Sequence, residues 1–193
     1  MRRLAAAILS VLVVVSLFSA TAQTIELSAS SSRCTVDLDG ARIVSFRSAG
    51  NEVFWNATPP QKSAPDWAHG GLPVCWPRFG VDASGAIHGV AWRRTFRLLE
   101  RRDGADSSAA VFGLHEGDAR LELVVSLSDA LSLEMRTVNV GTNELTCSFG
   151  FHPYFRVAER SRTLVEGLDG LRFEDDQSRP RSERGVWKGV LRV

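Results

Sequence analysis

Alternating apolar and polar positions occupy the middle of the chain and predict β-strands. Apolar residues recur at every second position from Leu121 to Leu127 and from Leu131 to Met135, which is the period of a strand with one buried face. In the second run the alternation shifts by one position near Thr137, and Val138 and Val140 continue it. A one-residue shift of this kind predicts a β-bulge.

Shorter runs of the same kind lie nearer the N-terminus, at residues 35–39 and 41–46 on either side of Gly40. Turn-forming residues separate the runs, for example at residues 48–51, 103–104 and 141–143. No long helical stripe and no internal repeat follow the first 22 residues. Many short strands at close spacing predict an all-β fold, an antiparallel sandwich or barrel.

The first 22 residues have the pattern of a signal peptide. Two arginines precede an apolar run, and Ala20-Thr21-Ala22 fits the small-residue cleavage pattern. A membrane anchor is the alternative, but the apolar run is shorter than the roughly 20 residues that a spanning helix needs. We therefore expect export to the periplasm or medium, no stable membrane span after cleavage, and one domain over residues 23–193.

Charge and cysteine content narrow the classes of function. The 193 residues carry a formal net charge of +1 with scattered arginines, so nothing indicates a nucleic-acid partner. The three cysteines, Cys34, Cys75 and Cys147, form no metal-binding spacing. One disulfide is compatible with export, but Cys75 and Cys147 lie in apolar runs and are expected to be buried and free.

A proline-rich stretch from Ala57 to Pro77 interrupts the strand pattern and predicts a long ordered loop, where binding residues tend to lie. Sugar sites combine aromatic faces, which cover the C–H patches of the ring, with polar side chains that bind the hydroxyls. The candidate aromatic residues are Trp67, Trp76, Trp92, Phe79 and Tyr154. The candidate polar residues are His69, His88, His152, Arg78, Arg93 and Asp175.

Two histidines have the most informative surroundings. His152 lies in the aromatic run FGFHPYF, and His88 precedes Gly89, which permits close approach of backbone or ligand. A histidine in an apolar run is either a hydrogen-bonded core residue or part of a pocket. The second histidine favours a pocket, whereas His115 has no such context and is given no role.

Four ordered segments resemble the aldose 1-epimerase superfamily, and within it the glucose-6-phosphate 1-epimerase (hexose-6-phosphate mutarotase) branch. Residues 70–80 (GGLPVCWPRFG) are similar to its GG[IL]PVC[WF]PxFG loop, and residues 87–96 to its HGFARxxxW segment. Residues 151–157 resemble its LHTYFRV strand and residues 165–175 its VxGLxGxxYxD element.

The resemblance implies a galactose mutarotase-like β-supersandwich that interconverts the α and β anomers of an aldose or aldose phosphate. It implies no cofactor and no metal, and a small-molecule sugar or sugar phosphate as the partner. His152 would be the acid, His88 a contact to a sugar hydroxyl, and Asp175 a residue that binds or orients the sugar. A histidine with a pKa near neutrality suits an acid of this kind.

The sequence also departs from the branch pattern. The family glutamate that acts as base lies on a strand well after the VxGLxGxxYxD element, so we expect the sandwich to be incomplete at its C-terminus and the base to be missing. His69 and Trp92 replace the branch arginines, for which Arg78 or Arg93 would have to compensate. A free hexose, a non-catalytic carbohydrate-binding protein and a structural β-domain therefore stay open as alternatives.

Overall fold

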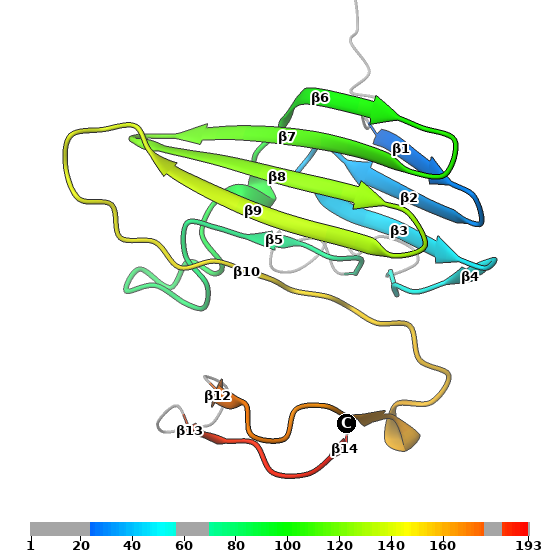
Figure 1. Ribbon diagram of the computed structural model, residues 1–193. Helices are drawn as coiled ribbons and strands as arrows, with labels where there is room; N and C mark the ends of the chain where they lie inside the picture. Colours follow the sequence, from blue (N-terminus) through cyan, green and yellow to red (C-terminus); the bar gives the residue numbers. More distant parts are fainter. Residues whose placement is uncertain (1–23, 57–69, 176–182, 193) are drawn as a thin grey trace, which may run out of the picture.

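The chain builds two four-stranded antiparallel sheets, which a computed structural model describes over residues 24–56, 70–175 and 183–192. The strand order is β1-β2-β3-β4 in one sheet and β6-β7-β8-β9 in the other. Figure 1 shows the two sheets as stacked layers, with the chain after β9 passing below them. Within the described residues the helical structure consists of two 3₁₀ turns, η1 (Ala91–Arg93) and η2 (Arg160–Arg162). The predicted all-β class is confirmed.

Hairpins connect the strands of the first sheet, because turn residues separate its short alternating runs. Its strands are β1 (Thr24–Ala29), β2 (Ser32–Asp37), β3 (Arg42–Ser48) and β4 (Asn51–Glu52). The register between β2 and β3 shifts at Thr35/Val36, so this sheet contains a bulge that the sequence pattern did not indicate.

The second sheet contains the strands that the alternation predicts most clearly. Its strands are β6 (Arg97–Asp103), β7 (Ser108–Glu116), β8 (Ala119–Leu127) and β9 (Leu131–Asn139). The bulge predicted near Thr137 is wrong, since β8 and β9 stay in one register from Leu127↔Leu131 to Ala119↔Asn139. Thr137 keeps the inward position, because its Oγ1 accepts a hydrogen bond from the Trp76 indole nitrogen at 2.9 Å. Val138 is left on the exposed face.

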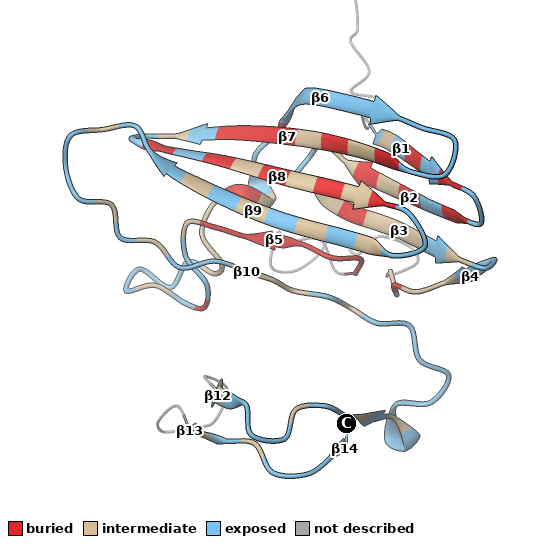
Figure 2. Cartoon of the chain, in the orientation of Figure 1, coloured by how far each residue is buried: buried red, intermediate tan, exposed pale blue. Residues whose placement is uncertain are grey.

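The hydrophobic core lies between the two sheets, where β1 and β2 pack against β7 and β8 (Figure 2). Alternate residues of β8, from Leu121 to Leu127, are 0–1% exposed. A polar link also joins the sheets, because the Ser108 hydroxyl donates to the Ser28 carbonyl and accepts from the Ser28 N–H. All three cysteines are free thiols, and Cys34 and Cys75 are buried, but Cys147 is only partly buried, contrary to the expectation from its apolar neighbours.

Three smaller strand pairs complete the described chain. They are β5 (Val74–Cys75) with β10 (Gly150–Phe151), β11 (Leu164–Val165) with β14 (Leu191–Arg192), and β12 (Arg172–Asp175) with β13 (Glu183–Val186). The last two pairs follow a long extended segment and lie apart from the large sheets, mostly exposed (Figures 1 and 2). No helix among the described residues is long and apolar enough to cross a membrane. Residues 1–22, which carry the signal-peptide prediction, lie outside the described chain.

Candidate functional site

Two of the segments singled out in the sequence pair directly with each other. Cys75 of β5 lies opposite Gly150 of β10 in an antiparallel arrangement. The pairing continues past the strand end, where the N–H of His152 donates to the Pro73 carbonyl at 3.1 Å. The backbone of the loop at residues 73–75 thus pairs with the backbone of residues 150–152 and holds His152 in place.

A glycine allows the same loop to pack closely against strand β3. Gly71 has φ +67°, and a Cβ there would lie 2.2 Å from the carbonyl oxygen of Ile43 in β3. Its carbonyl accepts the N–H of Tyr154 at 2.9 Å. Gly71 therefore fits between β3 and the Tyr154 segment only because it has no side chain.

The third segment brings His88 to the same place. Gly89 bridges to Trp76 in parallel, and a Cβ on Gly89 would lie 2.5 Å from the Trp76 carbonyl oxygen. His88 itself has φ +60°, in the left-handed region. Its N–H donates to the Gly80 carbonyl at 2.8 Å, and the Gly80 N–H donates to His88 Nδ1 at 3.2 Å. The loop thereby fixes both the backbone and the ring of His88.

The two imidazoles meet, as the sequence analysis predicts. The rings of His88 and His152 have centroids 5.3 Å apart in an edge-on arrangement. The ring of Tyr154 stacks on His152 at 4.9 Å, and the ring of Phe79 lies 5.1 Å from His88. Both histidines are partly exposed, so the cluster lies at the surface of the core.

Tyr154 has the most perturbed electrostatics in this cluster. Burial, and after it the nearby Cys75 thiol, raises the pKa of the phenol to about 12. Burial also raises the pKa of Cys75 to about 11. Both groups are therefore neutral at physiological pH, and the face of His152 rests on an uncharged aromatic ring.

Trp76 does not line the site in the way the sequence analysis expected. Its side chain is fully buried in the hydrophobic core, and its indole nitrogen donates to Thr137. The indole therefore has no exposed face to offer to a sugar. The contribution of Trp76 to the site is its backbone carbonyl, which accepts the N–H groups of Val90 and Ala91 at 2.9 and 3.0 Å.

The two candidate arginines are both exposed. The Arg93 guanidinium lies over the ring of Trp92, with Cζ 4.2 Å from the ring centroid. Trp92 is held in turn by its indole N–H, which donates to the Ile87 carbonyl at 3.0 Å. Arg78 precedes Phe79, and its charge contributes to the lowered pKa of Asp82, after the hydrogen bonds from Ser84 and Ala86.

The remaining candidates stay predictions. His69 and Trp67 lie outside the described residues. Asp175 ends strand β12, opposite Glu183 of β13, and its backbone belongs to the C-terminal strand pairs rather than to the segments around His152. The structure brings together His88 and His152 and keeps the described part of β12 in a separate hairpin.

Sequence reasoning missed Trp55. Its N–H donates to the Tyr154 carbonyl at 2.8 Å, and its ring lies 6.3 Å from the Tyr154 ring. Trp55 is 46% exposed, the same fraction as Phe79. Phe79, next to His88, and Trp55, next to Tyr154, are thus partly accessible, whereas Trp76 is not. No local signal distinguishes Trp55, because its position depends on a pairing with residues about a hundred positions later.

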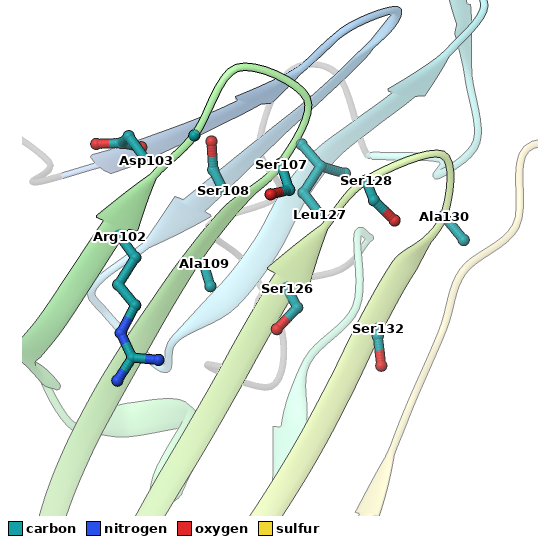
Figure 3. A pocket seen from close by; sticks show the side chains of 11 residues that line it. Arg102, Asp103, Ser107, Ser108, Ala109, Ser126, Leu127, Ser128, Ala130 and Ser132 are labelled. Atoms are coloured by element: carbon teal, nitrogen blue, oxygen red, sulfur yellow. The ribbon is translucent and has the colours of Figure 1, made fainter.

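A separate pocket lies at the far end of the second sheet. It has a volume of about 480 Å³ and is lined by small and polar residues from the β6–β7 and β8–β9 turns and the adjoining strands (Figure 3). Arg102, Ser126 and Ser132 belong to its lining. None of the described candidate residues lines this pocket, so it is not part of the histidine cluster.

The residues around His88 and His152 are of types that suit acid–base chemistry on a sugar. An imidazole exchanges protons near neutral pH and presents both a donor and an acceptor. Exposed aromatic rings beside it suit the apolar C–H face of a sugar. The residue types of the cluster are therefore those that proton transfer to a bound sugar would need.

Comparison with known proteins connects this geometry to a family. The family model described as aldose 1-epimerase matches residues 23–187, which include both histidines. The chain belongs to the aldose 1-epimerase family. The matched region therefore contains both histidines that the sequence analysis predicts as site residues.

Relatives within the family point to one branch. A protein named "Putative glucose-6-phosphate 1-epimerase" from Escherichia coli is 31% identical over 150 residues, covering 72% of this chain and 49% of that protein. A protein of the same name from Cenchrus ciliaris is 25% identical over 158 residues, covering 72% of this chain and 48% of that protein. The chain spans about half the length of these curated relatives.

Solved structures show the same fold. The crystal structure of a protein described as "a putative mutarotase" from Salmonella typhimurium superposes with a TM-score of 0.72 at 21% identity, covering 88% of this chain and 59% of that chain. A Synechocystis protein superposes with a TM-score of 0.75 at 19% identity, covering 89% of this chain and 66% of that chain. The predicted galactose mutarotase-like sandwich is therefore confirmed.

Proposed function

We propose that this aldose 1-epimerase family member interconverts the α and β anomers of a hexose or hexose 6-phosphate. The observation that carries the proposal is the His88–His152 pair, whose rings lie 5.3 Å apart beside accessible aromatic surface. Segments 64 residues apart in the sequence converge to form this pair. The family match and the named relatives support the same reaction class.

The reaction needs one acid and one base. His152, as imidazolium, gives a proton to the ring oxygen while a base removes the proton of the C1 hydroxyl. The bond between C1 and the ring oxygen breaks, and an open-chain aldehyde forms. Rotation about the C1–C2 bond and closure by the reverse proton transfers give the other anomer. No oxidation state changes and every proton is returned, so the chemistry requires no redox cofactor.

His88 has the role of a hydrogen-bonding partner in this scheme. Its Nδ1 accepts the N–H of Gly80, so the hydrogen of the neutral ring is carried by Nε2. A ring held in this way donates to an oxygen of the sugar. The exposed residues Phe79, next to His88, and Trp55, next to Tyr154, would cover an apolar face of the sugar.

The base is expected from a later segment, since the resemblance places it after the element that ends at Asp175. We propose that turnover is slow in any form of the protein that lacks this later segment. A carbohydrate-binding protein without catalysis is the second candidate, because accessible aromatic rings beside imidazole donors and acceptors suit sugar binding whether or not a base is present.

The choice between free and phosphorylated hexose rests on arginine. Arg78 and Arg93 are exposed and lie near His88 in the sequence, and a guanidinium is suited to bidentate phosphate binding. The names of the curated relatives favour the phosphate. The signal-peptide pattern, which predicts export, favours a free sugar.

Polarimetry with freshly dissolved α-glucose and α-glucose 6-phosphate tests the proposal. The protein should accelerate mutarotation of one or both, and His152→Ala should reduce the acceleration by about a hundredfold, a typical general-acid contribution. His115→Ala, an exposed residue of β7, is the matched control and should retain the full rate. If saturable sugar binding occurs without acceleration, the binding-protein alternative holds. If neither sugar binds nor reacts, both candidates fail.

A further inference from the structure

We propose that Ser148 is a positioning residue for His88, acting through the backbone of residues 77–80 and the ring of Phe79. The consequence for turnover rests on the proposed mutarotase function, whereas the consequence for the state of the His88 ring does not. Ser148 lies on the segment leading into β10 and was not singled out by the sequence.

Ser148 makes two hydrogen bonds to the loop that precedes His88. Its N–H donates to the Pro77 carbonyl at 3.0 Å, and its hydroxyl oxygen accepts the N–H of Phe79 at 3.0 Å. The loop is thereby fixed to the strand that continues into His152. Ser148 thus connects the segment that contains His152 to the loop that precedes His88, without contacting either imidazole in these bonds.

Phe79, whose backbone Ser148 holds, also contacts the His88 ring. Its ring lies over Gly150, where an added Cβ would be 2.8 Å from the Phe79 Cδ2. On its other side the Phe79 ring lies 5.1 Å from the ring of His88. Gly150 therefore provides the space that lets Phe79 pack beside His88, while Ser148 holds the Phe79 backbone.

The next residue, Gly80, favours one tautomer of the neutral His88 ring. Its N–H donates to His88 Nδ1 at 3.2 Å, and its carbonyl accepts the His88 N–H at 2.8 Å. A nitrogen that accepts a hydrogen bond carries no hydrogen, so the neutral ring is the Nε2–H tautomer. If Ser148 releases the loop, Gly80 N–H loses its alignment and the preference for this tautomer weakens.

Two-bond ¹H–¹⁵N correlation spectra of the full chain test the inference, because they report which ring nitrogen carries the hydrogen. Wild-type His88 should show Nε2–H with an unprotonated Nδ1. Ser148→Ala and, independently, Gly150→Ala should mix the tautomers and reduce kcat/KM about tenfold, since small misplacements can cost up to about a hundredfold. Ser132→Ala, an exposed serine of β9, is the matched control and should leave both quantities unchanged.

Thermal unfolding of each variant separates positioning from general damage. A tautomer change at an unchanged Tm supports the inference. An Nδ1–H tautomer in the wild type, or an unchanged tautomer in both folded variants, would overturn it. If the tautomers behave as predicted but the wild type accelerates no mutarotation, the positioning role stands and the proposed function fails.

Discussion

The chain has one tyrosine, so the absorbance of phenolate reports the state of the candidate site alone. Burial and the neighbouring Cys75 raise the pKa of Tyr154 to about 12, compared with about 10 for a solvated phenol. We predict that the folded protein develops phenolate absorbance near pH 12. In concentrated denaturant the same chain should titrate near pH 10, which supplies the reference.

The same shift has a consequence for stability, and its sign follows from proton binding. Between about pH 10 and pH 12 the unfolded chain has lost the phenolic proton and the folded chain has kept it, so stability falls as pH rises through this range. Each unit of difference between the folded and unfolded pKa is worth about 1.4 kcal/mol of stability, so a full two-unit difference sets an upper limit of about 2.7 kcal/mol. Because Tyr154 is only partly buried and solvent screens its surroundings, we expect a total loss of about 1–3 kcal/mol.

The titration is run with circular dichroism on the same samples, so that only folded protein is interpreted. Cys75→Ala removes the second cause of the shift and should lower the pKa of Tyr154 while leaving it above 10, because burial is the larger cause. Ionisation of Tyr154 near pH 10 in the folded wild type would refute the reasoning, since the phenol would then be solvated.

Two further predictions concern the packing that supports the site. Gly71→Ala and Gly50→Ala both place alanine at a positive φ, of +67° and +81°, but only the Gly71 Cβ meets another atom, 2.2 Å from the Ile43 carbonyl oxygen. Chemical denaturation should show a loss of about 1 kcal/mol for Gly50→Ala and a clearly larger loss for Gly71→Ala; equal losses would contradict the close packing. Trp76→Phe should lower the free energy of unfolding by about 1–3 kcal/mol, through the lost ring volume and the lost hydrogen bond to Thr137. The sugar affinity of this variant should match that of the wild type, and a large loss of affinity in a folded variant would show that the Trp76 side chain contacts the sugar.

The fold was predictable from local pattern because alternation is a property of each strand alone. The residues from Leu121 to Leu127 alternate in sequence and in burial. The pattern failed at Thr137, where an apolar–polar rule assigns the wrong face. A long-range hydrogen bond from Trp76 makes this threonine an inward residue, and no local window contains that information.

The site was partly predictable for a similar reason. His88 and His152 stand out by their glycine and aromatic neighbours, and the resemblance places both in one site. Which aromatic rings lie beside them depends on strand pairing between distant segments. That pairing buries Trp76 and leaves Trp55 accessible, and it gives Ser148 a role that its sequence neighbours do not indicate.

The central claim is that His88 and His152 belong to one sugar site, and the imidazole resonances of the chain's four histidines test it directly. Titration with glucose, and separately with glucose 6-phosphate, is followed in ¹H–¹⁵N spectra of the histidine rings. We predict that the signals of His88 and His152 shift together, with one saturation curve, while His115 on β7 stays fixed. Signals of His88 and His152 that respond to neither sugar, or that saturate at different concentrations, would contradict a shared site.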